Sequence, residues 1–489
     1  MRFGKNILIY AVADMIGRAM GLIISPFMTR LLTPEEYGTL GLLSATWALV
    51  ALLQFGGMDT SYQLFRVRET DDQGKILTTA TIVATLSTLV TLGLFSVAAF
   101  SGSWLRNYAK VSHSQLGWYL VGVIPTVLIS WYLYIFRFQH KPLPFARTNL
   151  LSKVISNLIL LLFLFLTPPN NRLTALFTGI FVTQGLSLAW ALWELRRSSL
   201  WPYSRHAFSF DLALEMLKYG VSFIPGAMTY AAVVSMDRLM VGWLAGPKEV
   251  ALVHLALNLG SVALMFRIWF SLVWNPSLVE WLATKDPLIY LPKLQLALLG
   301  LSTIFFPFTC LIAVWSDWLV AFLYPLEYLP IVPLVPVVVL VGTFSTLSLV
   351  AIATIIMDPS PKYYFMIYIC ALIITVCIGF LTVPHLGALG AILGTLGAEL
   401  FILGGWILRG KFIKKNLNLN WRPVLIFGTI TGIFIILYRP GIILTQEIFW
   451  ERILITVIIF AGVVMMGYRI FRQFIPSGWH AMWHLENQR

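Results

Sequence analysis

The residues with the clearest chemical potential in this sequence are charged side chains inside long apolar segments. Asp14 and Arg18 stand in the middle of "IYAVADMIGRAMGLIISPFMTR", residues 9–30, which is long enough to cross a membrane. A charge near the bilayer centre costs roughly 3 kcal/mol or more, so such residues generally face a polar interior and are functional. Arg18 is far from both ends of the segment, and we expect its guanidinium to line a cavity and bind phosphate or carboxylate oxygens in bidentate fashion.

A second interpretation of Asp14 and Arg18 remains open. Residues at i and i+4 share a helix face, so the two could neutralise each other as a permanent structural pair. Both interpretations hold together if Asp14 pairs with Arg18 only while the cavity is empty. A stripe of small residues beside them favours close approach of another helix or a ligand. The stripe consists of Ala13, Gly17, Gly21 and Ser25.

Three further charged residues are candidates for the same cavity or for ion coupling. Asp237 and Arg238 are adjacent in sequence and point about 100° apart on a helix, so they cannot satisfy each other fully. Arg238 and Arg267 lie nearer the ends of their segments, which leaves extension to the membrane surface as the alternative to cavity lining. Arg30 and Asp59 are closer still to the interfaces, and we expect structural roles for them.

Glu399 lies in the middle of another apolar segment, with no cation in its own helix. A carboxylate buried without a cationic partner can take up and release a proton as its access alternates between the two sides. Proton or sodium coupling through Glu399, Asp14 or Asp237 is therefore a hypothesis. The alternative for Glu399 is a protonated carboxyl group that forms hydrogen bonds between helices.

The sequence predicts no metal centre and no bound cofactor. Cys310, Cys370 and Cys377 lie inside apolar runs and are expected to be small hydrophobic residues. His480 and His484 share a helical face at i and i+4, a spacing that suits a metal ion. No third ligand accompanies them, and the neighbouring tryptophans favour an amphipathic tail at the membrane surface.

Composition defines the class of protein in which these residues act. Of 489 residues, 58% are hydrophobic and only 11% are charged, against about 25% charged in soluble domains. About fourteen apolar runs are long enough to span a bilayer. The chain is therefore predicted to be an all-α integral membrane protein.

Three prolines stand at the start of the tenth run. Pro330, Pro333 and Pro336 should bend or unwind the beginning of that helix.

The basic residues fall mainly into alternate connections between these runs. Those connections and the two ends hold about 24 of the 34 lysines and arginines, a bias that places both termini in the cytoplasm. One such group of basic residues is Arg137, Lys141, Arg147 and Lys153. The last of these also falls within the fifth run, predicted over Leu150 to Leu166. Orientation thus accounts for most of the net charge of +13, and no nucleic-acid partner is expected.

An internal repeat appears when the chain is shifted against itself by about 213 residues. "LLTPEEYGTL", residues 31–40, then meets "LAGPKEVALV", residues 244–253, so that Pro34 aligns with Pro247 and Glu36 with Glu249. Six runs separate the copies, which predicts two lobes of equal orientation related by an axis along the membrane normal. We expect a six-helix lobe over 1–208, a second over 209–419, and two additional spans with a cytoplasmic tail over 420–489.

Six stretches in order along the chain resemble a known group. The chain is similar to the polysaccharide transporters of the multidrug/oligosaccharidyl-lipid/polysaccharide exporter superfamily, especially O-antigen type flippases of lipid-linked oligosaccharides. Ala251 and Val253 stand where that family often has Gly and Tyr, and Ser222 replaces a frequent Pro. The stretches are "TRLLTPEEYGTLGLLSA", "FGGMDTSYQLFR", "FRFQHKPLPFARTNLLSKVISNL", "LKYGVSFIP", "SMDRLMVGWLAGPKEVA" and "PHLGALGAILGTLGAEL".

The resemblance implies translocation of an undecaprenyl-diphosphate-linked oligosaccharide across the bacterial inner membrane by alternating access of two lobes. The expected partners are that lipid-linked substrate, membrane lipid and polysaccharide assembly proteins. A lipid II flippase and a multidrug-type exporter remain alternatives with the same fold. A membrane polysaccharide polymerase or ligase is the alternative of another class, but the longest predicted periplasmic connection is short and carries no pair of catalytic groups, so no enzyme is expected.

Overall fold

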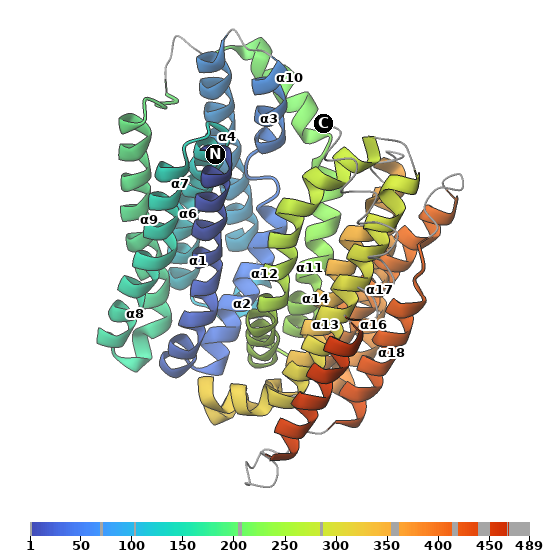
Figure 1. Cartoon of the computed structure of the whole chain (residues 1–489). Helices are drawn as coiled ribbons and strands as arrows, with labels where there is room; N and C mark the ends of the chain where they lie inside the picture. Colours follow the sequence, from blue (N-terminus) through green and yellow to red (C-terminus); the bar gives the residue numbers. More distant parts are fainter. Residues whose placement is uncertain are drawn as a thin grey trace. The chain divides into compact units, whose positions relative to one another are not determined.

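The computed structural model describes residues 2–68, 72–101, 104–203, 208–283, 287–353, 361–412, 419–438, 450–466 and 468. Every regular element within these ranges is a helix (Figure 1). The helices divide into two compact units, the first comprising residues 1–254 with 383–391, and the second residues 255–382 with 392–489.

The first unit contains the helices of the N-terminal half. They are α1 (Arg2–Leu31), α2 (Pro34–Val50), α3 (Met58–Arg68), α4 (Gln73–Ser101), α5 (Trp104–Ala109), α6 (His113–Phe138), α7 (Pro142–Leu150), the π-helix η1 (Leu151–Ile155), α8 (Ser156–Leu166), the 3-10 helix η2 (Pro169–Asn171), α9 (Arg172–Arg197), α10 (Phe210–Val221), α11 (Ile224–Leu244) and the first turns of α12 (Pro247–Ala283).

The second unit contains most of the remaining helices. They are the rest of α12, α13 (Pro287–Leu323), the 3-10 helix η4 (Leu326–Ile331), α14 (Leu334–Ala351), most of α16 (Pro361–Leu386) and of α17 (Ala388–Phe412), α18 (Arg422–Leu437) and a helix over residues 450–466. The chain passes between the two units inside α12, inside α16 and inside α17.

The predicted all-α membrane fold is confirmed, but the predicted number of spans is not. Ten helices of the described residues are long and apolar enough to cross a membrane, or eleven if α10 and α11, bent by 45°, form one span. The second predicted span is met by α2, which has only 17 residues before a turn at residues 51–57. The last two predicted spans, 424–444 and 452–470, extend beyond the described residues, so the count of about fourteen stays a prediction.

The proline-rich entrance to the tenth predicted span is unwound as expected. Residues Leu326–Ile331 form a 3-10 helix, and α14 begins only at Leu334. Proline lacks the N–H that the interior of an α-helix requires, so the run of prolines delays the start of the regular α-helix to Leu334.

The two copies of the sequence repeat begin helices in the same way. Thr33 caps α2 in a reciprocal capping box with Glu36, and Pro34 is the first helical residue. Pro247 likewise begins α12, and Glu249, the counterpart of Glu36, accepts the backbone N–H of Ala388 at 3.1 Å. Because proline has a helical φ and needs no donor at this position, both copies restart the helix after a short turn. The division into two six-helix lobes stays a prediction.

Helices α2 and α12 cross closely within the first unit, at positions that the repeat relates to each other. A Cβ atom on Gly38 would lie 1.7 Å from the carbonyl oxygen of Pro247 and 3.1 Å from the backbone nitrogen of Ala251. One on Gly41 would lie 3.2 Å from Cβ of His254. Gly38 aligns with Ala251 and Gly41 with His254 under the offset of about 213 residues. The glycines of α2 therefore supply the space for a crossing in which α12 carries larger residues.

A buried ion pair fixes the last described helix within the second unit. Arg452 of helix 450–466 donates to the carboxylate of Asp317 on α13, and both side chains are almost fully buried. Nearby, the indole of Trp315 donates to the hydroxyl of Thr456 at 3.0 Å. Together these contacts hold the helix against α13 where nonpolar packing alone would not fix its register.

Substitution of Gly38 by alanine should destabilise the protein, because the added methyl group would overlap the Pro247 carbonyl. We expect a loss of at least about 2 kcal/mol, at the upper end for overpacking of a buried site. The melting temperature of the purified protein in detergent measures this. The control is Gly93→Ala on α4, where a Cβ would meet nothing within 4 Å; equal melting temperatures for both variants would contradict the crossing.

Candidate functional site

A lysine lies near the middle of a helical run that is long enough to cross the membrane. Helix α7, the π-helix η1 and α8 form one apolar run over Pro142–Leu166, and the side chain of Lys153 within it is exposed. The sequence interpretation counted Lys153 with the basic residues of a cytoplasmic connection although it falls within the predicted run over Leu150–Leu166, and the candidate span in the structure begins earlier, at Pro142. A run of 17 residues was too short for a bilayer that needs about 20, and that shortfall was the signal that the span extends towards Pro142.

The π-helical turn determines how the residues around Lys153 are arranged. The N–H of Ser156 donates to the carbonyl of Leu151, five residues earlier, which widens the turn. The carbonyl of Ser152 accepts the side-chain amide of Gln184 at 3.1 Å, and the carbonyl of Lys153 accepts that of Asn157. Side-chain amides thus add hydrogen bonds to two carbonyls of the turn, inside a run that is long enough to cross the membrane. Such π-turns are frequent at functional sites.

Lys153 lines two polar cavities of the first unit. The first, cavity A, has a volume of about 390 Å³ and contains charges of both signs: Asp14, Asp59, Arg137 and Lys153. The guanidinium of Arg137 lies 5.1 Å from the ring centroid of Phe145, which also lines the cavity. Its other lining residues are Ala51, Leu52, Gln54, Phe55, Ser130, Leu133, Tyr134 and Asn149.

Cavity A brings a predicted residue together with three that the sequence did not single out for binding. Asp14 was expected in a cavity and lies in one. Asp59 was expected to be structural, and Arg137 and Lys153 were counted only as loop charges. They come from α3, α6 and η1, and the distance between these segments in the sequence hid their proximity.

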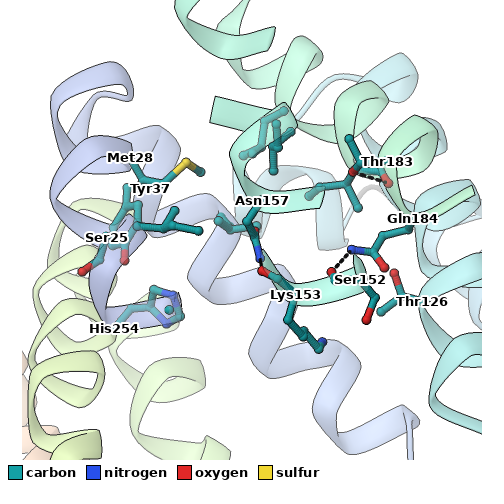
Figure 2. A pocket seen from close by; sticks show the side chains of 16 residues that line it. Ser25, Met28, Tyr37, Thr126, Ser152, Lys153, Asn157, Thr183, Gln184 and His254 are labelled. Atoms are coloured by element: carbon teal, nitrogen blue, oxygen red, sulfur yellow. Dashed lines mark hydrogen bonds between the residues drawn. The ribbon is translucent and has the colours of Figure 1, made fainter. Parts of the chain in front are cut away.

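The second cavity, cavity B, has a volume of about 280 Å³ and is shown in Figure 2. Its polar lining consists of hydroxyl groups, carboxamides, one imidazole and one ammonium group, and no carboxylate is among the described residues around it. Hydroxyl groups come from α1, α2, α6, η1 and α9, and the imidazole of His254 comes from α12. The polar residues are Ser25, Tyr37, Thr126, Ser152, Lys153, Asn157, Thr183, Gln184 and His254.

The small-residue stripe of α1 faces α7 and η1, next to both cavities. Asn149 on α7 donates its side-chain amide to the carbonyl of Ala13 at 2.8 Å. A Cβ on Gly17 would lie 3.2 Å from Nδ2 of Asn149 and 3.4 Å from Cγ of Lys153, whereas one on Gly21 would meet nothing within 4 Å. Gly17 therefore permits close approach of the helices, and Gly21 and Ser25 open onto cavity B.

Arg18 belongs to α1, one residue after Gly17, but its side chain lies outside the described part of the structure. Its predicted role in binding, and its predicted pairing with Asp14, stay predictions. Arg30 lies at the end of α1 and donates from Nη1 to the carbonyl of Pro26 at 2.8 Å, an interaction within one helix.

Asp237 and Arg238 of α11 form a local pair in the first unit. Asp237 is buried, and its Oδ1 atom lies 3.5 Å from Nε of Arg238 and accepts the backbone N–H of Arg238. The Nη2 atom of Arg238 also donates to the carbonyl of Val234 at 3.3 Å. The two side chains meet although they start about 100° apart on the helix, and neither lines cavity A or cavity B.

Arg267 and Glu399 meet through Ser345 in the second unit. Arg267 on α12 donates from Nε to the carbonyl of Ser345 at 3.3 Å. Glu399 on α17 is buried, hydrogen-bonds the side chain of Ser345 and interacts electrostatically with Arg267. The sequence had assigned the two residues to different roles because it showed no cation in the helix of Glu399. The cation comes from another helix, about 130 residues away in sequence.

The described residues contain no group of three or more His, Cys, Asp or Glu side chains that could hold a metal ion. Cys310 is buried and lies 3.7 Å from the hydroxyl of Thr431, in line with its expected role as a small core residue. His480 and His484 lie outside the described residues.

The fold is similar to those of membrane transporters. The lipid II flippase MurJ in an inward closed conformation aligns with a TM-score of 0.71 at 12% identity, covering 96% of this chain and 100% of that chain. An inward-facing multidrug resistance MATE family transporter of the MOP superfamily aligns with a TM-score of 0.65 at 13% identity, covering 83% and 98%. The outward-facing conformation of such a transporter gives 0.54 at 14% identity, covering 84% and 95%.

These likenesses define the class of protein: it is a multi-pass membrane protein with a transporter fold. Residues 3–281 match the sequence profile of the family described as polysaccharide biosynthesis protein, and the chain belongs to that family. No curated protein matches the sequence. The family resemblance that the sequence motifs suggested is thereby confirmed.

Cysteine labelling tests whether Lys153 faces water-accessible space. In a background with Cys310, Cys370 and Cys377 replaced by serine, Lys153→Cys should react with a charged, water-soluble methanethiosulfonate reagent because polar cavities of this size hold water. Leu158→Cys on the same run, where the leucine is 54% exposed on an apolar face, is the control and should react at least about tenfold more slowly in lipid. Equal rates would show that position 153 faces the lipid.

Proposed function

We propose that this protein is a flippase that translocates an undecaprenyl-diphosphate-linked oligosaccharide across the bacterial inner membrane, for O-antigen or exopolysaccharide biosynthesis. The observation that carries the proposal is the presence of polar, partly cationic cavities inside the helical body of a polysaccharide biosynthesis family member. A diphosphate and sugars cannot cross hydrocarbon unaided because desolvation of a charge costs several kcal/mol or more. The polyprenyl tail is apolar and can remain in the lipid while the polar groups cross.

The proposed route uses alternating access of two lobes, with Arg18, Arg238, Arg267 and Asp14 as substrate-binding residues. Arginine retains its charge when buried and binds phosphate oxygens with two parallel donors. In cavity A, Arg137 and Lys153 would add cations beside Asp14. We place both termini in the cytoplasm, because alternate connections carry most of the lysine and arginine residues.

A lipid II flippase and a multidrug-type exporter remain the alternatives of the same fold. Lipid II also carries a diphosphate, so cationic residues do not distinguish it from other lipid-linked sugars. Organic cations are disfavoured because the arginines proposed to bind the substrate, Arg18, Arg238 and Arg267, would repel them. A polymerase or ligase is the alternative of another class, and the transporter fold supports transport over catalysis.

Transport against a gradient needs an energy source, for which we propose proton or sodium coupling without a bound cofactor. The candidates are Glu399, Asp237 and Asp14. Glu399 is the foremost, because its interaction with Arg267 and Ser345 joins α17 to α12 and α14. A change of protonation would alter that interaction and so the balance between helix arrangements. Polysaccharide assembly proteins and membrane lipid are the proposed partners, and nucleic acid is not.

Arg18→Ala should abolish export of the surface glycan while the amount of protein in the membrane stays unchanged. The loss follows from removal of the cation proposed to bind the diphosphate. Glycan export in a strain that depends on this protein is the measurement, with protein abundance determined by immunoblot. The matched control is Arg30→Ala on the same helix, which should export normally because Arg30 lies at the end of α1, where Nη1 donates to the carbonyl of Pro26, and lines neither cavity. Full export by an abundant Arg18→Ala variant rejects the assignment.

Glu399→Gln should remove the dependence of transport on an ion gradient, because the amide keeps the hydrogen-bonding shape but cannot exchange a proton. Transport into vesicles is measured with a pH gradient, a sodium gradient and neither. The control is Glu451→Gln, which changes a carboxylate on an exposed residue of helix 450–466. If the Glu399→Gln variant retains the gradient dependence of the unmodified protein, coupling through this residue is wrong.

A further inference from the structure

We propose that cavity B binds one anionic sugar unit, a sugar that carries a carboxylate or a phosphate, with Lys153 as its charged contact. The proposal rests on the proposed function and adds a substrate subsite that the sequence did not suggest. It follows from the lining of the cavity, from the charges on either side of Lys153 and from the way the π-turn holds the cavity wall.

The lining of cavity B suits a hydroxyl-rich ligand. Sugar hydroxyl groups both donate and accept hydrogen bonds, and the carboxamides of Asn157 and Gln184 together with the surrounding hydroxyl groups offer both functions. Tyr37 adds an aromatic ring with a polar tip. The volume of about 280 Å³ lies at the lower limit of the roughly 300–1,000 Å³ of pockets for drug-sized ligands, so it suits one sugar ring rather than a whole oligosaccharide.

The charges around Lys153 favour an anion in cavity B over cavity A. In cavity A the carboxylates of Asp14 and Asp59 offset the positive charges of Arg137 and Lys153, so the net attraction for an anion is small on that side. Among the described residues that line cavity B, the charged or titratable groups are Lys153 and His254, and neither is acidic. An anion that contacts Lys153 is therefore least opposed on the side of cavity B.

The π-turn holds two of the binding groups in place before a ligand arrives. Gln184 and Asn157 each donate one amide hydrogen to a carbonyl of the turn, which fixes the direction of their side chains. Figure 2 shows both side chains beside Lys153 at the wall of the cavity. Side chains that are already fixed lose less conformational freedom when a ligand binds than mobile ones do. The turn that carries Lys153 thus also fixes the side chains of Gln184 and Asn157.

The test is binding of three soluble probes to the purified full-length protein in lipid nanodiscs, measured by saturation-transfer NMR: glucuronate, glucose 1-phosphate and glucose. We expect at least one of the two anionic sugars to bind at least tenfold more tightly than glucose. Glucuronate alone identifies a sugar carboxylate as the ligand, and glucose 1-phosphate alone identifies a sugar phosphate. Equal binding of all three probes, or binding of none, overturns the proposal.

Variants assign the binding to cavity B. Lys153→Met and Gln184→Leu should each weaken binding of the anionic sugar at least tenfold, whereas Lys153→Arg should retain it. Asp59→Asn, which alters cavity A and not cavity B, and Lys141→Met, which lies in neither cavity, should not weaken it. Unchanged melting temperatures show that a loss of binding is not a loss of fold. Normal binding by Lys153→Met overturns the proposal, and so does loss of binding in Asp59→Asn.

The outcome is independent of that for the proposed function. If Arg18→Ala abolishes glycan export but Lys153→Met binds the probes normally, the subsite is wrong and the flippase assignment stands. If Lys153→Met loses probe binding but Arg18→Ala exports normally, the subsite stands and the assignment of Arg18 in the flippase is wrong.

Discussion

The inability of hydrocarbon to satisfy polar groups is the constraint on which the arrangement of the first unit depends. A lysine in the middle of a membrane-length run is tolerated only where water, counter-ions or polar side chains surround it. Lys153 meets this condition because two polar cavities adjoin it, one with carboxylates and one with hydroxyl groups and amides. In the π-turn, the carbonyls of Ser152 and Lys153 accept hydrogen bonds from the side-chain amides of Gln184 and Asn157, which keeps these polar groups paired within the run.

Charged side chains are accommodated in two ways, and direct pairs occur in both units, as Asp237 with Arg238 in the first unit shows. In the first unit, cations and carboxylates share a cavity with room for other molecules. In the second, the charges of Arg267 and Glu399 meet at Ser345, and Arg452 meets Asp317 directly with both side chains buried. A buried pair such as Arg452 and Asp317 can contribute to fixing the register of two helices, whereas charges that line a cavity border space that a ligand or an ion could occupy.

Much of the fold was predictable from the sequence, because membrane spans are encoded by length and hydrophobicity. The repeat was visible through Pro34 and Pro247, which each start a helix. The site was less accessible to such reasoning. Lys153 was missed because it was counted with the basic residues of a connection although it falls within the predicted run over Leu150–Leu166, and because hydropathy does not predict the π-turn that carries it. The contact of Glu399 with Arg267 was missed because it joins helices far apart in the sequence, and no spacing rule reports such proximity.

The passage of the chain between the two units has a mechanical consequence. The units are joined inside α12, α16 and α17, at residues 254–255, 382–383 and 391–392, and none of these junctions is a loop. Helices resist bending because each turn is held by backbone hydrogen bonds, except where a proline removes one, as Pro384 does close to the junction in α16. At each junction the backbone hydrogen bonding of a helix therefore continues from one unit into the other, where a flexible linker would have interrupted it.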